Sequence, residues 1–451
     1  MRPGLSGWRG RLLGVRFRNR PPGDPTVADV VAALQVAADR SARGDTVVAR
    51  SCAGVLVREP LAELPDVVDR AVETVGLDAV AVAWQHGWQP HDLWQLSRRR
   101  QPASALSYLV DLLAADCARY SEAALAPAWC AQLRRLEAEL WWRGDRPHLG
   151  QWLARARVDR RAGLELVVGV LGMLRGLPRM SELMPPPGSP AARSARGSVG
   201  SGAPPAAAGN GSSGAPEGVD PKMLTRVRAL LAKAESTEFA EEADAFFAKA
   251  QELMTRYSLE RAMLFAEGDG GVGSGPGGRR IWLDSPYVSA KSLLINQVAS
   301  ANRAKAVFHA GLGCVTVLGD EMDLELVEVL STSLLVHASG AMVAAGRQLA
   351  RSGQSRTKSF RQSFLVSYAT RIGERLTAAD AATAEAVASE LGDGRLLPVL
   401  AARTQEVERL YETLFPELRT QRVSVSNAAG WGAGRVAADL ADLDVRRAVR
   451  R

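Results

Sequence analysis

Apolar side chains recur at helical spacing along most of the chain. The first clear stripe consists of Val27, Val30, Val31, Leu34 and Ala38. Similar stripes follow within residues 106–113 and 133–141. Apolar positions three and four residues apart line one face of an α-helix, and that face is stable only when another element covers it. We therefore predict an all-α helical domain over residues 25–184.

Two further stripes predict a helical hairpin over residues 220–267. Asp220 can cap the first helix, and Pro221 suits its first turn, where a missing N–H is tolerated. The first stripe is Leu224, Val227, Leu230, Leu231 and Ala234, and the second is Ala243, Phe246, Phe247, Ala250, Leu253, Met254 and Tyr257. Turn-forming side chains separate them at 235–238. Gln251 falls on the opposite face of the second helix, where we expect it to be exposed.

The hairpin sequence is similar to that of a known family. The string LLAKAESTEFAEEADAFFAKAQELMTRYSLE, residues 230–260, resembles the helical signature of the bacterial and phage family called domain of unknown function 2786. The residues that carry the resemblance are Leu230, Leu231, Ala234, Glu235, Ser236, Ala243, Ala250, Gln251, Leu253, Met254 and Tyr257. Residues 282–443 resemble its companion module, domain of unknown function 7168. The resemblance implies a structural role for these residues and supplies no catalytic set.

The remaining second half mixes short strands with helices. Residues 304–309 and 314–318 are rich in Val and Phe on either side of a glycine-containing turn, which predicts a β-hairpin. Helical spacing returns within 320–336, 360–376 and 396–414. We therefore expect an α+β domain with a small sheet at 281–445, and the whole chain to be mainly α.

Pro-, Gly- and Ser-rich stretches mark the boundaries between these parts. Residues 185–219 read as a disordered, flexible linker, and residues 268–280 as a shorter Gly-rich linker. All six lysines follow the longer stretch, so the two halves differ in composition. The ends, 1–24 and 446–451, read as a basic flexible arm and a basic tail.

The net charge of +7 resides in those ends. Residues 1–20 and 446–451 contain ten Arg and no acid, so the rest of the chain carries −3. Nucleic-acid contact is therefore expected through the Arg tails, together with a ridge of Lys222, Arg226 and Lys233 on the first hairpin helix. The alternative is a self-neutralising hairpin, in which the acids Glu241, Glu242 and Asp244 offset that ridge.

Residues able to carry chemistry are few and scattered. The four cysteines form no C-x-x-C pair, and His86 and His91 lack metal-ligand spacing, so we expect no disulfide, metal or cofactor. His309 and Cys314 flank the expected β-turn without an orienting third residue. Gly430 and Gly434 favour close helix packing over anion binding. Seven of the ten tryptophans lie within residues 26–183, where core packing is more common than base stacking.

These observations favour an interaction or assembly protein over an enzyme. We expect an unidentified protein partner, nucleic-acid association, a cytoplasmic location and no membrane contact, because no run of about 18 apolar residues is present. The alternative function is a hydrolase or nucleic-acid-processing enzyme whose site is dispersed in the sequence, with Asp320, Glu321, Asp323 and His337 as candidates.

Overall fold

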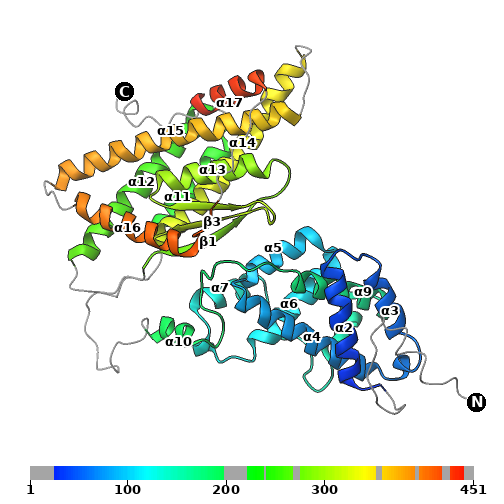
Figure 1. Ribbon diagram of the computed structural model, residues 1–451. Coiled ribbons are helices and arrows are strands. Elements are labelled where there is room, and N and C mark those ends of the chain that lie inside the picture. Colours follow the sequence, from blue (N-terminus) through cyan, green and yellow to red (C-terminus); the bar gives the residue numbers. More distant parts are fainter. Residues whose placement is uncertain are drawn as a thin grey trace, which may run out of the picture. The chain divides into compact units, whose positions relative to one another are not determined.

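The chain forms two compact units that divide between Ala207 and Ala208 (Figure 1). The computed structural model describes residues 25–197, 221–237, 240–267, 275–351, 358–391, 396–418 and 427–440. The basic arm and the basic tail expected from the sequence lie outside these residues. Residues 198–219 of the long expected linker also lie outside them. The boundary between the units falls within that linker.

The described part of the first unit contains helices and no strand, as predicted. Its α-helices are α2 (Val27–Ala42), α3 (Val48–Leu56), α4 (Pro65–Gln85), α5 (Pro90–Arg100), α6 (Ala103–Cys117), α7 (Pro127–Arg135), α8 (His148–Ala156), α9 (Arg160–Arg175) and α10 (Pro190–Gly197). Thr26 and Asp29 form a capping box at the start of α2. Helix α9 packs against α2, α3 and α4, and Val167, Val168 and Leu171 are buried there.

Helix α10 lies where the sequence suggested a linker. The Ser189 hydroxyl accepts a hydrogen bond from the backbone N–H of Ala192 (3.1 Å), which caps the helix, and Pro190 occupies the first turn. The Gly188 N–H donates to the Ala124 carbonyl (3.0 Å) and attaches this segment to the unit. The small residues that suggested a linker thus include a complete helix-start signal.

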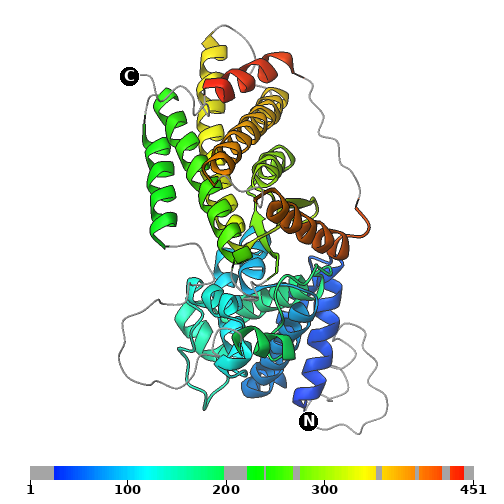
Figure 2. The ribbon, with the colours of Figure 1, turned by 90° about the vertical axis from the view of Figure 1, so that its left-hand side faces the viewer.

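The second unit combines a helical hairpin, a small sheet and long helices (Figures 1 and 2). The hairpin consists of α11 (Pro221–Ser236) and α12 (Ala240–Glu267), which run side by side in Figure 2. The elements that follow are β1 (Gly277–Trp282), α13 (Val288–Ala301), β2 (Lys305–His309), β3 (Cys314–Gly319), α14 (Glu321–Arg351), α15 (Lys358–Leu391), α16 (Leu396–Leu414) and α17 (Ala428–Leu440).

The sheet is antiparallel, with strand order β1-β3-β2. The predicted hairpin of β2 and β3 is confirmed, with Lys305 opposite Leu318 and His309 opposite Cys314. Strand β1 was not predicted, because its first residues belong to the glycine-rich stretch that reads as a linker. Gly277 pairs with Gly319 and Trp282 with Cys314. The fold is mainly α with a three-stranded sheet.

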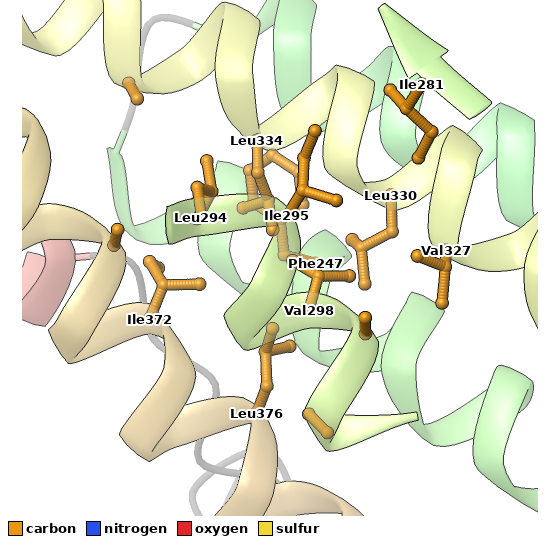
Figure 3. Packing of buried hydrophobic residues seen from close by; sticks show 14 of the residues in the cluster. Phe247, Ile281, Leu294, Ile295, Val298, Val327, Leu330, Leu334, Ile372 and Leu376 are labelled. Carbon is orange, nitrogen blue, oxygen red and sulfur yellow. The ribbon is translucent and has the colours of Figure 1, made fainter. Parts of the chain in front are cut away.

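One hydrophobic core joins the hairpin to the rest of the second unit (Figure 3). Phe247 of α12 lies among Leu294, Ile295 and Val298 of α13 and Leu330 of α14. The expected hairpin region, 220–267, and the expected α+β region, 281–445, therefore share their core and form one folding unit. The side of the hairpin that faces this core is unavailable to partners.

Helix α17 packs against α15 (Figure 1). A Cβ added at Gly430 or Gly434 would overlap the backbone carbonyl oxygen of Phe360 or Phe364, respectively. The interpretation of these glycines as close-packing positions is confirmed.

Within the described residues, one segment is long and apolar enough to cross a membrane by length and composition alone, Glu321–Gly346 of α14. A single such helix is weak evidence for a membrane span, because the core helices of other proteins are equally long and apolar. Helix α14 itself contributes Val327, Leu330 and Leu334 to the core.

Candidate functional site

The three cations predicted as a ridge lie on the outer side of α11. Lys222, Arg226 and Lys233 are exposed, and their spacing of four and seven residues places them along one line of the helix. The opposite side of α11 buries Val227 and Leu231 in the core. The ridge is about 16 Å long, since a helix rises about 1.5 Å per residue.

The described residues show the electrostatic surroundings of two ridge cations, Arg226 and Lys233. Within the described residues, no carboxylate pairs with Arg226 or Lys233, and the Lys233 Nζ lies 5.7 Å from the ring centroid of Phe246. Glu242 of α12 accepts a hydrogen bond from the Thr237 hydroxyl (2.9 Å), and Glu325 lies 3.6 Å from Arg228 on another side of α11. The side chains of Glu241 and Asp244 lie outside the described residues. Of the three acids expected to offset the ridge, Glu242 is the one whose side chain is described, and it bonds Thr237.

The residues that carry the family resemblance divide by position. Leu231, Ala234, Ala250 and Met254 are buried in the core, and Leu230, Leu253 and Tyr257 are partly buried against it. Glu235 and Ser236 are exposed at the end of α11, and the side chain of Ala243 lies outside the described residues.

The predicted exposure of Gln251 on α12 is wrong. The sequence suggested an exposed position, whereas the side chain is fully buried. Its amide nitrogen donates to the Thr255 hydroxyl and to the Asn302 amide oxygen, both at 3.1 Å. Helix α12 packs against both α11 and α15, so it is buried over a wider face than one apolar stripe covers. A buried amide requires hydrogen-bond partners, and Asn302 and Thr255 supply them.

Gln251 belongs to a larger cluster of buried and half-buried side chains, which we call the polar centre: Gln251, Thr255, Asn302, Arg303 and Asp380. The Thr255 hydroxyl donates to Asp380 Oδ1 (2.9 Å), and Arg303 Nη1 donates to both oxygens of the same carboxylate (2.9 and 3.1 Å). Arg303 has a φ of +57°, in the left-handed region that non-glycine residues rarely adopt. The polar centre thereby connects α12, the end of α13 and α15.

Asp323 lies beside the polar centre and is only 7% exposed. Burial raises the pKa of its carboxyl to about 6, the nearby Arg303 opposes this increase, and the charge of Asp320 adds to it. Ser258 is a hydrogen-bond partner of this carboxyl. Asp320 itself lies 3.4 Å from Arg403 of α16.

The three acids and one histidine proposed as a dispersed site do not converge. Only Asp320 and Asp323 come together; Glu321 forms an ion pair with Arg279 (2.7 Å), and His337 Nδ1 lies 2.9 Å from the Tyr368 hydroxyl. Burial lowers the pKa of His337. The three acids around the start of α14 have different partners, and His337 lies 14 residues after Asp323 in the same helix, so these residues do not form one site.

His309 and Cys314 are partners in the β2–β3 register, yet they form no reactive pair. His309 Nε2 lies 2.8 Å from the Thr316 hydroxyl, and Cys314 is buried in the sheet. Among the residues that the structure describes, no group of three or more His, Cys, Asp or Glu side chains could hold a metal ion.

Sequence reasoning missed the polar centre because it is built from separate elements. Asn302, Arg303 and Asp380 follow no common spacing. One local signal was present: Gln251, Thr255 and Ser258 lie at helical spacing on α12, and all three are buried. A polar stripe beside the apolar one would have indicated a helix buried on two sides.

Comparison with known proteins identifies the hairpin alone. Residues 222–261 match a family described as protein of unknown function (DUF2786). No curated protein and no solved structure matches the chain. The match covers α11 and most of α12, which contain the basic ridge and the α12 part of the polar centre.

Proposed function

We propose that this protein is a nucleic-acid-associated binding protein, and that α11 contacts phosphate groups through Lys222, Arg226 and Lys233. The observation that carries the proposal is the exposed ridge on a helix whose other side is buried in the core. Lys and Arg side chains on such a helix can follow a phosphate backbone without reading bases. The association is therefore expected to tolerate many sequences.

The strength of this contact follows from its charge. Three phosphate contacts correspond to a slope of log affinity against log salt of about −2.7 on duplex DNA and about −2 on single strands. The Arg-rich ends, residues 1–20 and 446–451, would add further contacts, since they contain ten Arg. Binding is then weak at physiological salt and increases steeply as salt is lowered.

The test compares two triple variants of the full-length protein with the same loss of charge. The ridge variant is K222Q/R226Q/K233Q. The control variant is K249Q/R409Q/R435Q, which removes three other exposed cations of the same unit. Binding to duplex and single-stranded DNA is measured by fluorescence anisotropy across a salt series. The ridge variant should reduce the magnitude of the slope of log affinity against log salt by about 2 to 3. The control variant should reduce it by less than about 1. Equal effects of the two variants would exclude a specific role for α11.

A second candidate is a hydrolase or nucleic-acid-processing enzyme, which Asp323 favours. A buried carboxyl that exchanges a proton near neutral pH, beside Arg303 and Ser258, has the properties of a general acid or base. The test incubates the full-length protein with DNA, RNA and aryl phosphate or ester substrates. Turnover that is lost in D323N and retained in D320N would favour this candidate; turnover unaffected by D323N would exclude Asp323 from catalysis.

A further inference from the structure

Trp141 differs from most tryptophans of the first unit. Trp84, Trp88, Trp129 and Trp152 are buried, as expected for core residues. Trp141 is 36% exposed, and its neighbour Leu140 is 55% exposed. Both lie in the irregular segment 138–147 between α7 and α8. Two large apolar side chains are thus presented to solvent side by side, which is common at binding surfaces.

The ring of Trp141 is held in one orientation. Its indole N–H donates to Asp111 Oδ1 (2.9 Å), and the other oxygen of that carboxylate lies 2.8 Å from His148 Nε2. Asp111 and His148 are both buried. The ring of Trp142 packs on His148, with centroids 4.4 Å apart, and meets Trp141 edge to face at 5.7 Å. Little conformational freedom remains to be lost when a ligand stacks on this surface.

Arginines surround the exposed Trp141 ring in the sequence, and one of them contacts it. The Arg155 guanidinium lies 4.3 Å from the ring centroid of Trp141. Residues 134–161 contain eight Arg and four acids, a net charge of +4, whereas residues 25–197 as a whole carry only +2. Arg146 and Arg157 are exposed within this stretch, and the exposed Arg143 forms an ion pair with Asp145 (2.9 Å). The positive charge of the described unit is thus concentrated in the sequence around Trp141.

We propose that this surface, which we call the Trp141 platform (Leu140, Trp141, Trp142, Arg143, Arg146 and Arg155), binds single-stranded nucleic acid. Unpaired bases would stack on the Trp141 ring and the Arg155 guanidinium, and the arginines would contact the phosphates. Every base has a π-face, so such binding tolerates sequence. A duplex keeps its bases stacked internally and cannot use the ring. The positive charge selects a polyanion over an apolar peptide.

This inference rests on the proposed nucleic-acid association, to which it adds a preference for single strands. The platform belongs to the first unit and the α11 ridge to the second, so the two proposals can fail separately. If both hold, two weak sites on one chain raise the affinity for a long strand above that of either site.

The test uses W141F and W141L in the full-length protein. Both substitutions remove the indole N–H that bonds Asp111, so their effect on folding is matched, and thermal unfolding checks this. Only W141F keeps a ring. Binding to a labelled 20-nucleotide oligothymidine is measured by anisotropy at low salt. W141L should bind at least about fivefold more weakly than W141F, since stacking contributes roughly 5- to 100-fold per base. Duplex binding should be equal for the two.

Four results are decisive. Equal affinity of W141F and W141L for oligothymidine would overturn the platform, whatever the α11 ridge variant does. If W141L loses oligothymidine binding while K222Q/R226Q/K233Q binds oligothymidine fully, the result would support the platform and exclude the ridge as a binding site. If W141L loses duplex binding to the same degree as it loses oligothymidine binding, the platform does not select single strands. Displacement of oligothymidine by polyglutamate at equal charge concentration would identify the platform as a site for acidic proteins and overturn the inference.

Discussion

Gln251 and Asn302 form a buried side-chain amide pair across 51 positions of sequence. Gln251 belongs to the matched hairpin, whereas Asn302 follows α13 and precedes β2. The Asn302 amide nitrogen also donates to the Val298 carbonyl (2.8 Å), which closes the end of α13. The pair therefore fixes the hairpin to the part of the fold that follows it. This explains why a polar residue occupies a core position of α12.

Replacing Gln251 should destabilise the second unit even though the residue is polar. Q251A leaves the Asn302 amide oxygen buried without its donor, and such a group costs about 1–3 kcal/mol. Q251D should cost more, because it also buries a charge. The control is E260A, at an exposed position of α12, which should change the free energy of unfolding by less than about 0.5 kcal/mol. Denaturant unfolding measures all three. Similar stability of Q251A and E260A would show that the amide pair contributes little.

Asp323 should make the second unit less stable as pH rises. Its pKa in the folded state, about 6, lies above the ordinary value of 3.8, so the folded state binds the proton more tightly. The resulting stabilisation is complete below about pH 4 and is lost as pH rises through 6. The difference in unfolding free energy between D323N and the wild type should therefore shift in favour of D323N by about 2 kcal/mol between pH 4 and pH 7. A pH-independent difference would contradict the burial argument.

The apolar stripes of the helices could be predicted from the sequence, but the burial of the polar residues between them could not. Leu231 and Met254 are at core positions because helical periodicity identifies one buried face directly. Gln251 could not be placed, since its burial depends on a second packing face that α15 supplies from more than 100 residues away. Arg280, next to the glycines of β1, is buried although it interrupts any apolar alternation. Trp141 shares the residue type of the buried Trp152, and only tertiary packing separates their roles.

Arg303 allows its backbone conformation to be tested apart from its ion pair. R303A and R303G both lose the contacts with Asp380, so each should be less stable than the wild type. At a φ of +57° an alanine meets a steric cost that glycine does not. R303G should therefore be the more stable of the two by about 0.5–1 kcal/mol, after the greater freedom of glycine in the unfolded chain is included. Thermal unfolding gives the order, and a more stable R303A would refute the left-handed conformation.

The glycines of α17 offer the strictest test of helix packing, because one of them is a natural control. At Gly434 a Cβ would meet the Phe364 carbonyl, a backbone atom that cannot rotate away, so G434A must displace α17 from α15. Overpacking of this kind costs about 1–3 kcal/mol. Gly432 lies two residues earlier in the same helix, and an added Cβ there meets no atom within 4 Å. Alanine is the better helix former by about 1 kcal/mol, so G432A should be neutral or stabilising. The two substitutions change the same atoms, and their unfolding temperatures should move in opposite directions. Equal shifts would mean that α17 does not pack against α15 through this face.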